Sequence, residues 1–297
     1  MTYLLSLLTL TVASIGCISP QSKINSTADF AEVMTMEYPS AFEDDPEIIS
    51  EETDSTSDSF SDTKVQTESH ELEINRFNDD IQPYSFDHTI WNEILRNYVT
   101  ESGLVNYKGL LSDRVQLDTY IDLLKKNLPQ DDWSRNEKLA YWMNAYNALT
   151  VDLILKNYPL NSIQDIKDPW KQRLWGLGSE DYNLDEIEHK ILRKMDEPRI
   201  HFGIVCASFS CPKLLNEAFT ADNVDELLTK ATKEFLADPN RNTITASKVE
   251  LSKIFQWFAA DFKKDGTIID FINKYTEVSI DPKAKKRFKT YDWKLNE

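Results

Sequence analysis

The chain has 297 residues and a formal net charge of −17, and most of that charge lies in one segment. Between Glu32 and Asp80 there are sixteen acidic residues against two basic ones, which leaves fourteen of the seventeen net negative charges in that stretch. The low isoelectric point therefore comes mainly from the acidic segment 32–80, and it does not indicate an acidic surface on a folded domain. No basic patch is interleaved with aromatic residues, which argues against a nucleic-acid partner.

Residues 1–17 are predicted to be a signal peptide. The apolar run between Leu4 and Val12 is too short to span a bilayer and is typical of the hydrophobic part of an export signal. Small residues precede Cys17, as in bacterial lipoproteins, where this cysteine is lipidated. Ordinary cleavage and a retained anchor are the alternatives. We therefore expect a cell-envelope protein facing the periplasm or the exterior, bound to the membrane through a lipid anchor at Cys17.

Residues 18–82 are predicted to be a disordered acidic linker. They are rich in Ser, Thr, Asp and Glu and lack periodic apolar positions, so they cannot bury enough surface to offset the entropy of ordering. A single globular domain is predicted over 83–297. We expect an α+β fold that is mostly helical, with a small antiparallel β-sheet.

The strongest helix is predicted over Arg135–Asn157, because its apolar residues recur at helical spacing. Ser134 and Glu137 are placed as an N-terminal capping box. Other helices are expected over 86–98, 117–124, 183–194, 221–235 and 267–275, a hairpin turn at 176–178, and a two-stranded element over 243–251. His88, at the start of the first of these helices, is expected to be exposed.

The stretch 199–212 gathers most of the reactive side chains. Its β-branched part, Ile200–Val205, predicts a buried strand followed by a turn. His201 and Cys206 would then point to opposite faces, so they form a pair only if the chain bends at or before Cys206. Cys206 and Cys211 are close enough in sequence to form a disulfide if their Cα atoms come within about 7 Å; buried thiols are the alternative.

Two further polar groups sit on predicted helices. Asn144 and Asn147 share a face of the central helix, where an unpaired amide is costly. They are expected to hold a neighbouring loop through its backbone or to orient a catalytic group. His189 follows Glu188 on the next helix, where a structural bridge and an acid–base role are both open.

Familiar cofactor signatures are missing from the sequence. It contains no phosphate-binding Gly-rich loop, no CxxC pair and no HExxH motif. Two cysteines and scattered histidines are a weak zinc signal. We therefore expect no metal and no cofactor.

Four separated motifs carry a resemblance to a known family. They are Arg-Asn-Glu-Lys-Leu-Ala-Tyr-Trp-Met-Asn-Ala-Tyr-Asn-Ala at 135–148, Leu-Asp-Glu-Ile-Glu-His at 184–189 with Ile-Leu-Arg at 191–193, Arg-Ile-His-Phe with Cys-Ala-Ser and Ser-Cys-Pro between 199 and 212, and Tyr-Asp-Trp-Lys-Leu-Asn at 291–296. In this order they resemble the domain of unknown function 547 family. The resemblance implies one α+β domain, in exported bacterial proteins or in plant and animal proteins that join it to modules such as glutaredoxins. Val205 departs from the pattern, since relatives often have an asparagine there, which weakens any polar role for position 205.

Three functions remain open from the residues. The first is a membrane-tethered binding domain without enzymatic activity, whose polar motif contacts a ligand or partner. The contacts in this case would come from Asn147, Glu188, Ser208 and Ser210.

The second function is a thiol-dependent hydrolase or acyltransferase. Cys206 would be the nucleophile, with His201 or His189 as the base and Asn144 or Asp292 orienting the histidine. The third is a thiol–disulfide redox role for Cys206 and Cys211.

Overall fold

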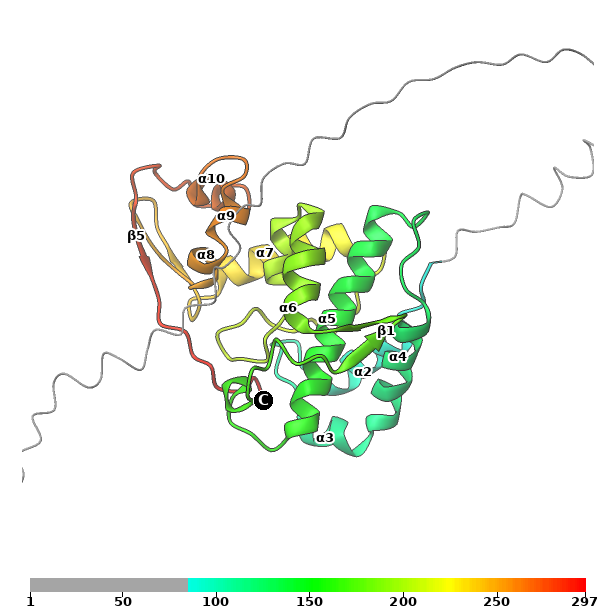
Figure 1. Cartoon of the computed structure of the whole chain (residues 1–297). Helices are drawn as coiled ribbons and strands as arrows, with labels where there is room; N and C mark the ends of the chain where they lie inside the picture. Colours follow the sequence, from blue (N-terminus) through cyan, green and yellow to red (C-terminus); the bar gives the residue numbers. More distant parts are fainter. Residues whose placement is uncertain (1–84) are drawn as a thin grey trace, which may run out of the picture. The chain divides into compact units, whose positions relative to one another are not determined.

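The computed structural model describes residues 85–297 (Figure 1). The predicted signal peptide with Cys17, the predicted linker and the predicted start of the domain at residue 83 lie outside the described residues. Within the described part, no helix is both long and apolar enough to cross a membrane.

Helices make up most of the described elements. The α-helices are α2 (Thr89–Tyr98), α3 (Tyr107–Ser112), α4 (Arg114–Lys126), α5 (Arg135–Asn157), α6 (Leu184–Glu186), α7 (Val224–Ala237), α8 (Ile254–Trp257), α9 (Ala259–Phe262) and α10 (Ile268–Asn273). Three 3₁₀-helices and one π-helix join them: η1 (Ile163–Asp165), the π-helix η2 (Ile187–Ile191), η3 (Leu192–Met195) and η4 (Pro198–Phe202). The strands are β1 (Trp175–Leu177), β2 (Glu180–Tyr182), β3 (Thr243–Ile244), β4 (Lys248–Leu251) and β5 (Lys285–Phe288).

Helix α5 is the centre of the core and contacts α3, α4, α6 and α7 (Figure 1). Its residues 139–155 are all buried, so the helix has no solvent face, as expected for a helix enclosed by others. The predicted capping box is confirmed, because Ser134 Oγ accepts from the Glu137 N–H and the Glu137 carboxylate accepts from the Ser134 N–H. The bounds of α5 are those predicted.

A buried carboxylate ties α5 to its neighbours. Asp152 accepts hydrogen bonds from the Trp175 indole at 2.7 Å and from Lys156 at 2.6 Å, and it pairs with Arg114 of α4. A buried charge is tolerated when several donors surround it. Asp152 therefore fixes α4 and β1 against the central helix.

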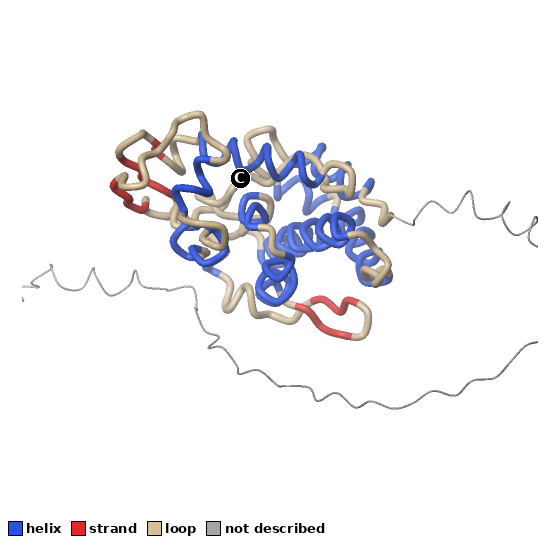
Figure 2. The backbone as a smooth tube through the Cα atoms, turned by 90° about the horizontal axis from the view of Figure 1, so that it is seen from above, coloured by secondary structure: helices blue, strands red, loops and turns tan. Residues whose placement is uncertain are grey.

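Two small sheets complete the α+β fold and lie well apart from each other (Figures 1 and 2). β1 and β2 form a hairpin as predicted, but its turn lies at Gly178 and Ser179, and Gly176 lies in β1 opposite Asp181. β3 and β4 pair antiparallel, as predicted, and β5 adds to β4 in parallel. The expected fold class is confirmed, with the parallel β4–β5 pair as an added feature.

The strand predicted at Ile200–Val205 is wrong. Pro198 begins the 3₁₀-helix η4, whose N-cap Glu197 accepts from the Arg199 N–H. A short apolar run has the same pattern in a buried strand and in a buried helical turn, so periodicity alone could not decide between them. His88 is also not exposed, because its Nδ1 lies 2.7 Å from the Tyr120 hydroxyl in the core.

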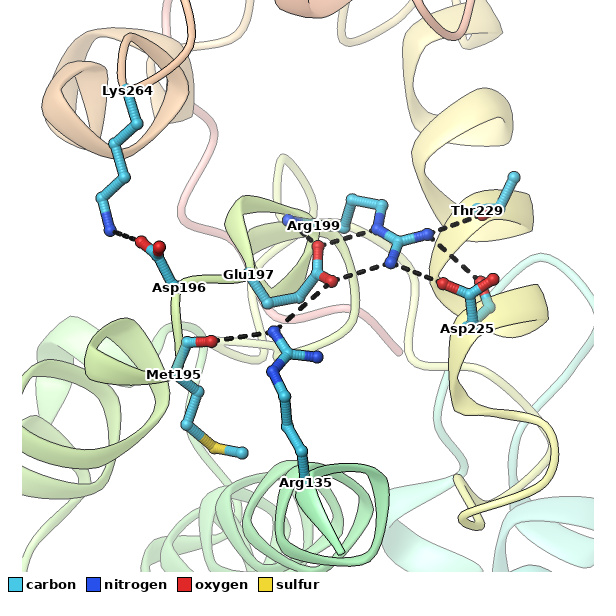
Figure 3. A network of polar contacts seen from close by, with 8 residues as sticks. All are labelled: Arg135, Met195, Asp196, Glu197, Arg199, Asp225, Thr229 and Lys264. Atoms are coloured by element: carbon cyan, nitrogen blue, oxygen red, sulfur yellow. Dashed lines mark hydrogen bonds and ion pairs between the residues drawn. The ribbon is translucent and has the colours of Figure 1, made fainter.

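A network of charges holds η4 in place (Figure 3). The Arg199 guanidinium donates to both carboxylate oxygens of Glu197 at 2.7 Å and to Asp225 of α7 at 2.7 Å. It also donates to Thr229 Oγ1 at 2.7 Å. Arg135, at the start of α5, donates to the Met195 carbonyl at 2.8 Å. Since α5 and α7 both hold this segment, the loop that follows η4 starts from a fixed position.

Candidate functional site

The loop 203–212, called the thiol loop below, begins against α5. The Asn147 side chain accepts from the Val205 N–H at 3.0 Å and donates to the Gly203 carbonyl at 2.9 Å. Asn144 makes the same pair of bonds with Phe219, at 3.1 and 2.7 Å. Both amides therefore hold backbone segments, which is the structural alternative considered from the sequence.

Residues 291–296, called the C-terminal strap, close the other side of the thiol loop. The Phe209 N–H donates to the Lys294 carbonyl at 2.7 Å, and the Ser210 N–H donates to the Asp292 carbonyl at 3.1 Å. In return, Ser210 Oγ accepts from the Asp292 N–H at 2.9 Å. The thiol loop and the strap are thus joined along their backbones.

Arg241 clamps the same loop. Its guanidinium donates to the Cys211 carbonyl at 2.9 Å and to the Phe209 carbonyl at 2.6 Å, and it lies 5.5 Å from the centre of the Phe209 ring. Ala207, inside the loop, has a positive φ of 55°. This left-handed conformation costs an L-residue about 1–2 kcal/mol, and such strain gathers at functional sites.

The bend at Ala207 brings the two thiols together. The sulfur atoms of Cys206 and Cys211 lie 3.1 Å apart, and both cysteines are free. The Cys206 sulfur also lies 3.0 Å from Ser208 Oγ and 3.3 Å from the Tyr291 hydroxyl of the strap. The structure therefore shows the thiol alternative, and closing an S–S bond of about 2.05 Å would need the sulfur atoms to move only a short way.

The two thiols have opposite acidities. Burial alone would raise the pKa of Cys206, but hydrogen bonds from Cys211, Ser208 and Tyr291 outweigh it and lower the pKa to about 7. Burial, followed by the bond to Cys206, raises the pKa of Cys211 well above its usual value. Because hydrogen bonds to the charged form favour it, Cys206 holds the thiolate and Cys211 the proton.

The histidines form a separate cluster. His201 Nε2 donates to Asp261 at 2.8 Å, and Arg193 forms a two-pronged pair with the same carboxylate at 2.7 and 3.0 Å. Arg193 also lies 2.7 Å from His189 Nδ1. His201 stacks on Phe258 with ring centres 3.9 Å apart, and burial lowers the pKa of its imidazole. In the described part of the chain, the hydrogen bonds to the Cys206 sulfur involve no histidine.

Glu188 is acted on by charges of both clusters. It is buried and accepts a hydrogen bond from the Tyr146 hydroxyl at 3.0 Å. Burial raises the pKa of Glu188 to about 7; the Tyr146 hydrogen bond and the Arg193 charge act against that rise, and the charge of Cys206 adds to it. Glu188 is therefore a buried acid that titrates near neutral pH.

The predicted site residues thus divide into groups. Cys206, Cys211 and Ser208 meet at one point, while His189 and His201 meet at Asp261 and Arg193.

Asp292 does not orient a histidine. Its side chain is exposed and accepts from the Lys294 N–H at 3.0 Å, and Asp261 is the carboxylate that holds His201. Ser210 likewise faces the strap backbone.

Several residues of the site were missed from the sequence. Tyr291 and Arg193 lie in motifs that were recognised but were given no role, and Asp261 gave no local signal. Tyr291 reaches the thiol from 85 residues away along the chain. Among residues 85–297, no group of three or more His, Cys, Asp or Glu side chains is arranged to hold a metal ion.

The fold and the site define a mostly helical α+β domain with a hydrogen-bonded pair of free thiols. Residues 130–236 match the family model described as "Protein of unknown function, DUF547". The match covers α5, the thiol loop and nearly all of α7, so the expected resemblance to this family is confirmed. The family description assigns no activity. No curated protein and no solved structure matches the chain.

Proposed function

We propose that this domain exchanges thiols and disulfides through Cys206 and Cys211. The observation that carries the proposal is the 3.1 Å contact between the two free sulfur atoms, with Cys206 partly exposed and Cys211 buried. The attacking thiol of an exchange reaction needs both thiolate character and access. Cys206 has the more acidic thiol and belongs to a partly exposed residue, and Cys211 is placed to resolve the product.

The reaction follows from these positions. The Cys206 thiolate attacks one sulfur of a substrate disulfide, forms a mixed disulfide and releases the first substrate thiolate, which takes a proton from water. Cys211 then loses its proton and attacks the Cys206 sulfur, which releases the second substrate thiolate. The substrate gains two electrons and the cysteine pair becomes a disulfide. A dithiol reductant, small molecule or protein, returns the pair to its reduced form.

The geometry favours exchange over acyl transfer. A cysteine hydrolase needs a base within hydrogen-bond reach of the nucleophile. The sulfur of Cys206 instead has hydroxyl and thiol neighbours, while His201 is bonded to Asp261.

The test uses the full chain with Cys17 replaced by Ala, so that the thiol pair holds the remaining cysteines. An aromatic disulfide that releases a coloured thiolate is added to the reduced protein. We expect an internal disulfide in the parent protein and a stable mixed disulfide at Cys206 in Cys211→Ser. Cys206→Ser should react much more slowly, because the pKa of Cys211 is raised. Equal rates for the two Ser variants, or no internal disulfide, would refute the proposal.

Binding without catalysis is the second candidate. Three partly exposed aromatic side chains flank the thiol: Tyr291 lies 4.8 Å from Trp257 and 4.6 Å from Trp293 between ring centres. Partly exposed Trp and Tyr side chains are frequent anchors for partners. In this case, ligand contact would come from the polar groups of the thiol loop, and replacing Cys206 by Ser would leave function intact.

We further propose that the domain works in the cell envelope, tethered to the membrane by a lipid on Cys17. The apolar run at Leu4–Val12 and the small residues before Cys17 support this. Cell fractionation and the mass of the N-terminal peptide test it. Replacing Cys17 by Ala should move the protein from the membrane to the soluble fraction, and an unchanged distribution would refute the tether.

A further inference from the structure

Strand β5 carries a concentration of positive charge. Residues 85–297 contain 30 basic and 33 acidic side chains, so this part of the chain is close to neutral as a whole. Five of the basic side chains nevertheless lie within seven residues, at Lys283, Lys285, Lys286, Arg287 and Lys289. No acidic residue occurs at positions 282–291. The run is therefore a local excess of cations that the overall composition does not explain.

The cations of β5 project into solvent. All four residues of the strand are exposed, including Phe288 with 38 % of its surface. The ion pairs formed among residues 85–297 include none with Lys285, Lys286 or Arg287. The carboxylate opposite β5 in the sheet, that of Glu250, is bonded to Lys248 of its own strand at 2.7 Å. A negatively charged partner would therefore meet these cations without first breaking an ion pair.

The outer edge of β5 also offers backbone groups. In the described part of the chain β5 is the last strand of the three-stranded sheet, and β4 is its neighbour (Figure 1). The Lys289 N–H, for example, donates to the Leu251 carbonyl of β4 at 2.8 Å. Because the backbone groups of successive strand residues point to opposite sides, those of Lys286 and Phe288 face away from β4. The edge thus presents two N–H and two C=O groups beside a row of cations.

This combination of charge and backbone selects among partners. A second copy of β5 is disfavoured, because its lysines would face those of the first strand, and lysine on an edge strand hinders self-association for this reason. An anionic lipid surface matches the charge but makes no ladder with the N–H and C=O groups. An extended acidic peptide matches both, since it adds backbone hydrogen bonds as a further strand and places carboxylates beside the cations.

The same edge leads to the thiol pair. Phe288 ends β5, and Tyr291 begins the C-terminal strap three residues later, a span of at most about 11 Å. The Tyr291 hydroxyl lies 3.3 Å from the Cys206 sulfur. A peptide that follows the chain beyond β5 therefore comes near the reactive sulfur within a few residues.

We propose that the outer edge of β5 binds an extended acidic segment of a protein substrate as an added strand, which brings a cysteine next to that segment to Cys206. This inference rests on the exchange function proposed above and names its substrate class: disulfide-bonded proteins with extended, Asp- or Glu-rich segments beside a cysteine. The carboxylates face Lys285, Lys286 and Arg287, and the backbone bonds form at Lys286 and Phe288. The chemical step is the exchange already described.

The test compares peptides whose single cysteine forms a mixed disulfide with a coloured aromatic thiol. One peptide is rich in glutamate, the second has glutamine in place of every glutamate, and the third is the acidic peptide with N-methyl groups on alternate backbone nitrogens. Each is made with the cysteine at either end, because an added strand can run in either direction. Reduced full chains carrying Cys17→Ala are used at low salt, and the released thiol is followed by absorbance.

We expect the acidic peptide to react about 10-fold faster than the neutral one with the parent chain. The advantage should shrink in about 0.5 M salt, which screens exposed charges. It should also shrink for the N-methylated peptide, which keeps the charge but cannot form the full backbone ladder.

Charge reversal distinguishes the β5 edge from the rest of the surface. Lys285→Glu with Lys286→Glu should abolish the preference for the acidic peptide. The matched control is Lys230→Glu with Lys233→Glu, which makes the same change of charge at exposed positions of α7 and should keep the preference. A small aromatic disulfide without a peptide should react alike with all three chains, because the thiol pair is unchanged.

The outcomes separate the two proposals. If the small disulfide reacts with none of the chains, the exchange function fails, and the edge is then tested by the binding of cysteine-free peptides, followed by fluorescence anisotropy. The edge proposal is overturned if the parent chain does not prefer the acidic peptide, if N-methylation leaves its rate unchanged, or if the charge-reversed chain keeps the preference. The comparison of peptides needs only the parent chain, so it decides even if the charge-reversed chain does not fold. Co-sedimentation with anionic phosphatidylglycerol vesicles, without a peptide preference, would assign the edge to a membrane instead.

Discussion

Replacing Asn147 by Ala tests how α5 holds the thiol loop. The side chain is 2 % exposed and satisfies two buried backbone groups, the Val205 N–H and the Gly203 carbonyl. Each unpaired buried group costs about 1–3 kcal/mol, and the truncated side chain leaves a void. We therefore expect the free energy of unfolding to fall by about 2–5 kcal/mol.

Asn144 provides a matched control on the same helix. It makes the same two bonds with Phe219, so Asn144→Ala should lose a similar amount of stability, measured by urea unfolding with tryptophan fluorescence. The two variants should differ at the thiol. Asn147→Ala should change the alkylation rate of Cys206 in the folded protein, because Val205 precedes Cys206 directly. The reasoning fails if Asn147→Ala keeps full stability, or if both variants change the thiol equally.

Three further predictions concern charged groups. Arg199→Lys keeps the charge but cannot reach all the partners of the guanidinium, so we expect a loss of about 1–2 kcal/mol in urea unfolding. Arg173→Lys, at an exposed pair with Glu186, should leave the stability almost unchanged. Burial raises the pKa of Glu188 from its usual 4.5 to about 7, so its penalty is absent below pH 4.5, grows between pH 4.5 and 7, and stays constant above 7. Glu188→Gln should therefore gain on the parent protein by roughly 2–3 kcal/mol between pH 5 and pH 8, and parallel stability curves would contradict this. Burial would raise the pKa of Asp261, but hydrogen bonds from His201 and Arg193 hold it well below its usual range. That stabilisation is complete above the unfolded pKa near 4 and is lost as pH falls further, so Asp261→Asn should flatten the fall of stability below pH 5 by about 1–2 kcal/mol; an unchanged slope would refute it.

The elements that depend on residues close together in sequence, such as helix α5 and the helix caps, could be predicted from the sequence. The bounds of α5 and its Ser134–Glu137 cap follow from apolar spacing and capping chemistry within the helix itself. The Asn183 cap of α6 is also local, since its side chain accepts from the Glu186 N–H three residues on at 2.8 Å. The thiol loop was recognised as a reactive stretch for the same reason, because its side chains are close in sequence.

The features that the sequence did not predict depend on contacts between residues far apart in the chain. The segment at 198–202 begins with the local signals Glu197 and Pro198, but its place in the fold is set by Arg199, which Asp225 and Thr229 of α7 hold from far along the chain. The partner of His201 is likewise distant, since Asp261 lies 60 residues further along the chain. Asp292 was chosen for its place in a recognised motif, but in that motif the Tyr291 hydroxyl is the group that reaches the thiol.

The C-terminal strap has a consequence for when the thiols become reactive. Residues 291–296 leave the ribosome after the thiol loop, α5 and Arg241, and they supply the Tyr291 hydroxyl that helps to lower the pKa of Cys206. A nascent chain that has not yet placed the strap would carry a less acidic thiol at Cys206. The thiol of Cys206 is thus at its most acidic only when the strap is in place.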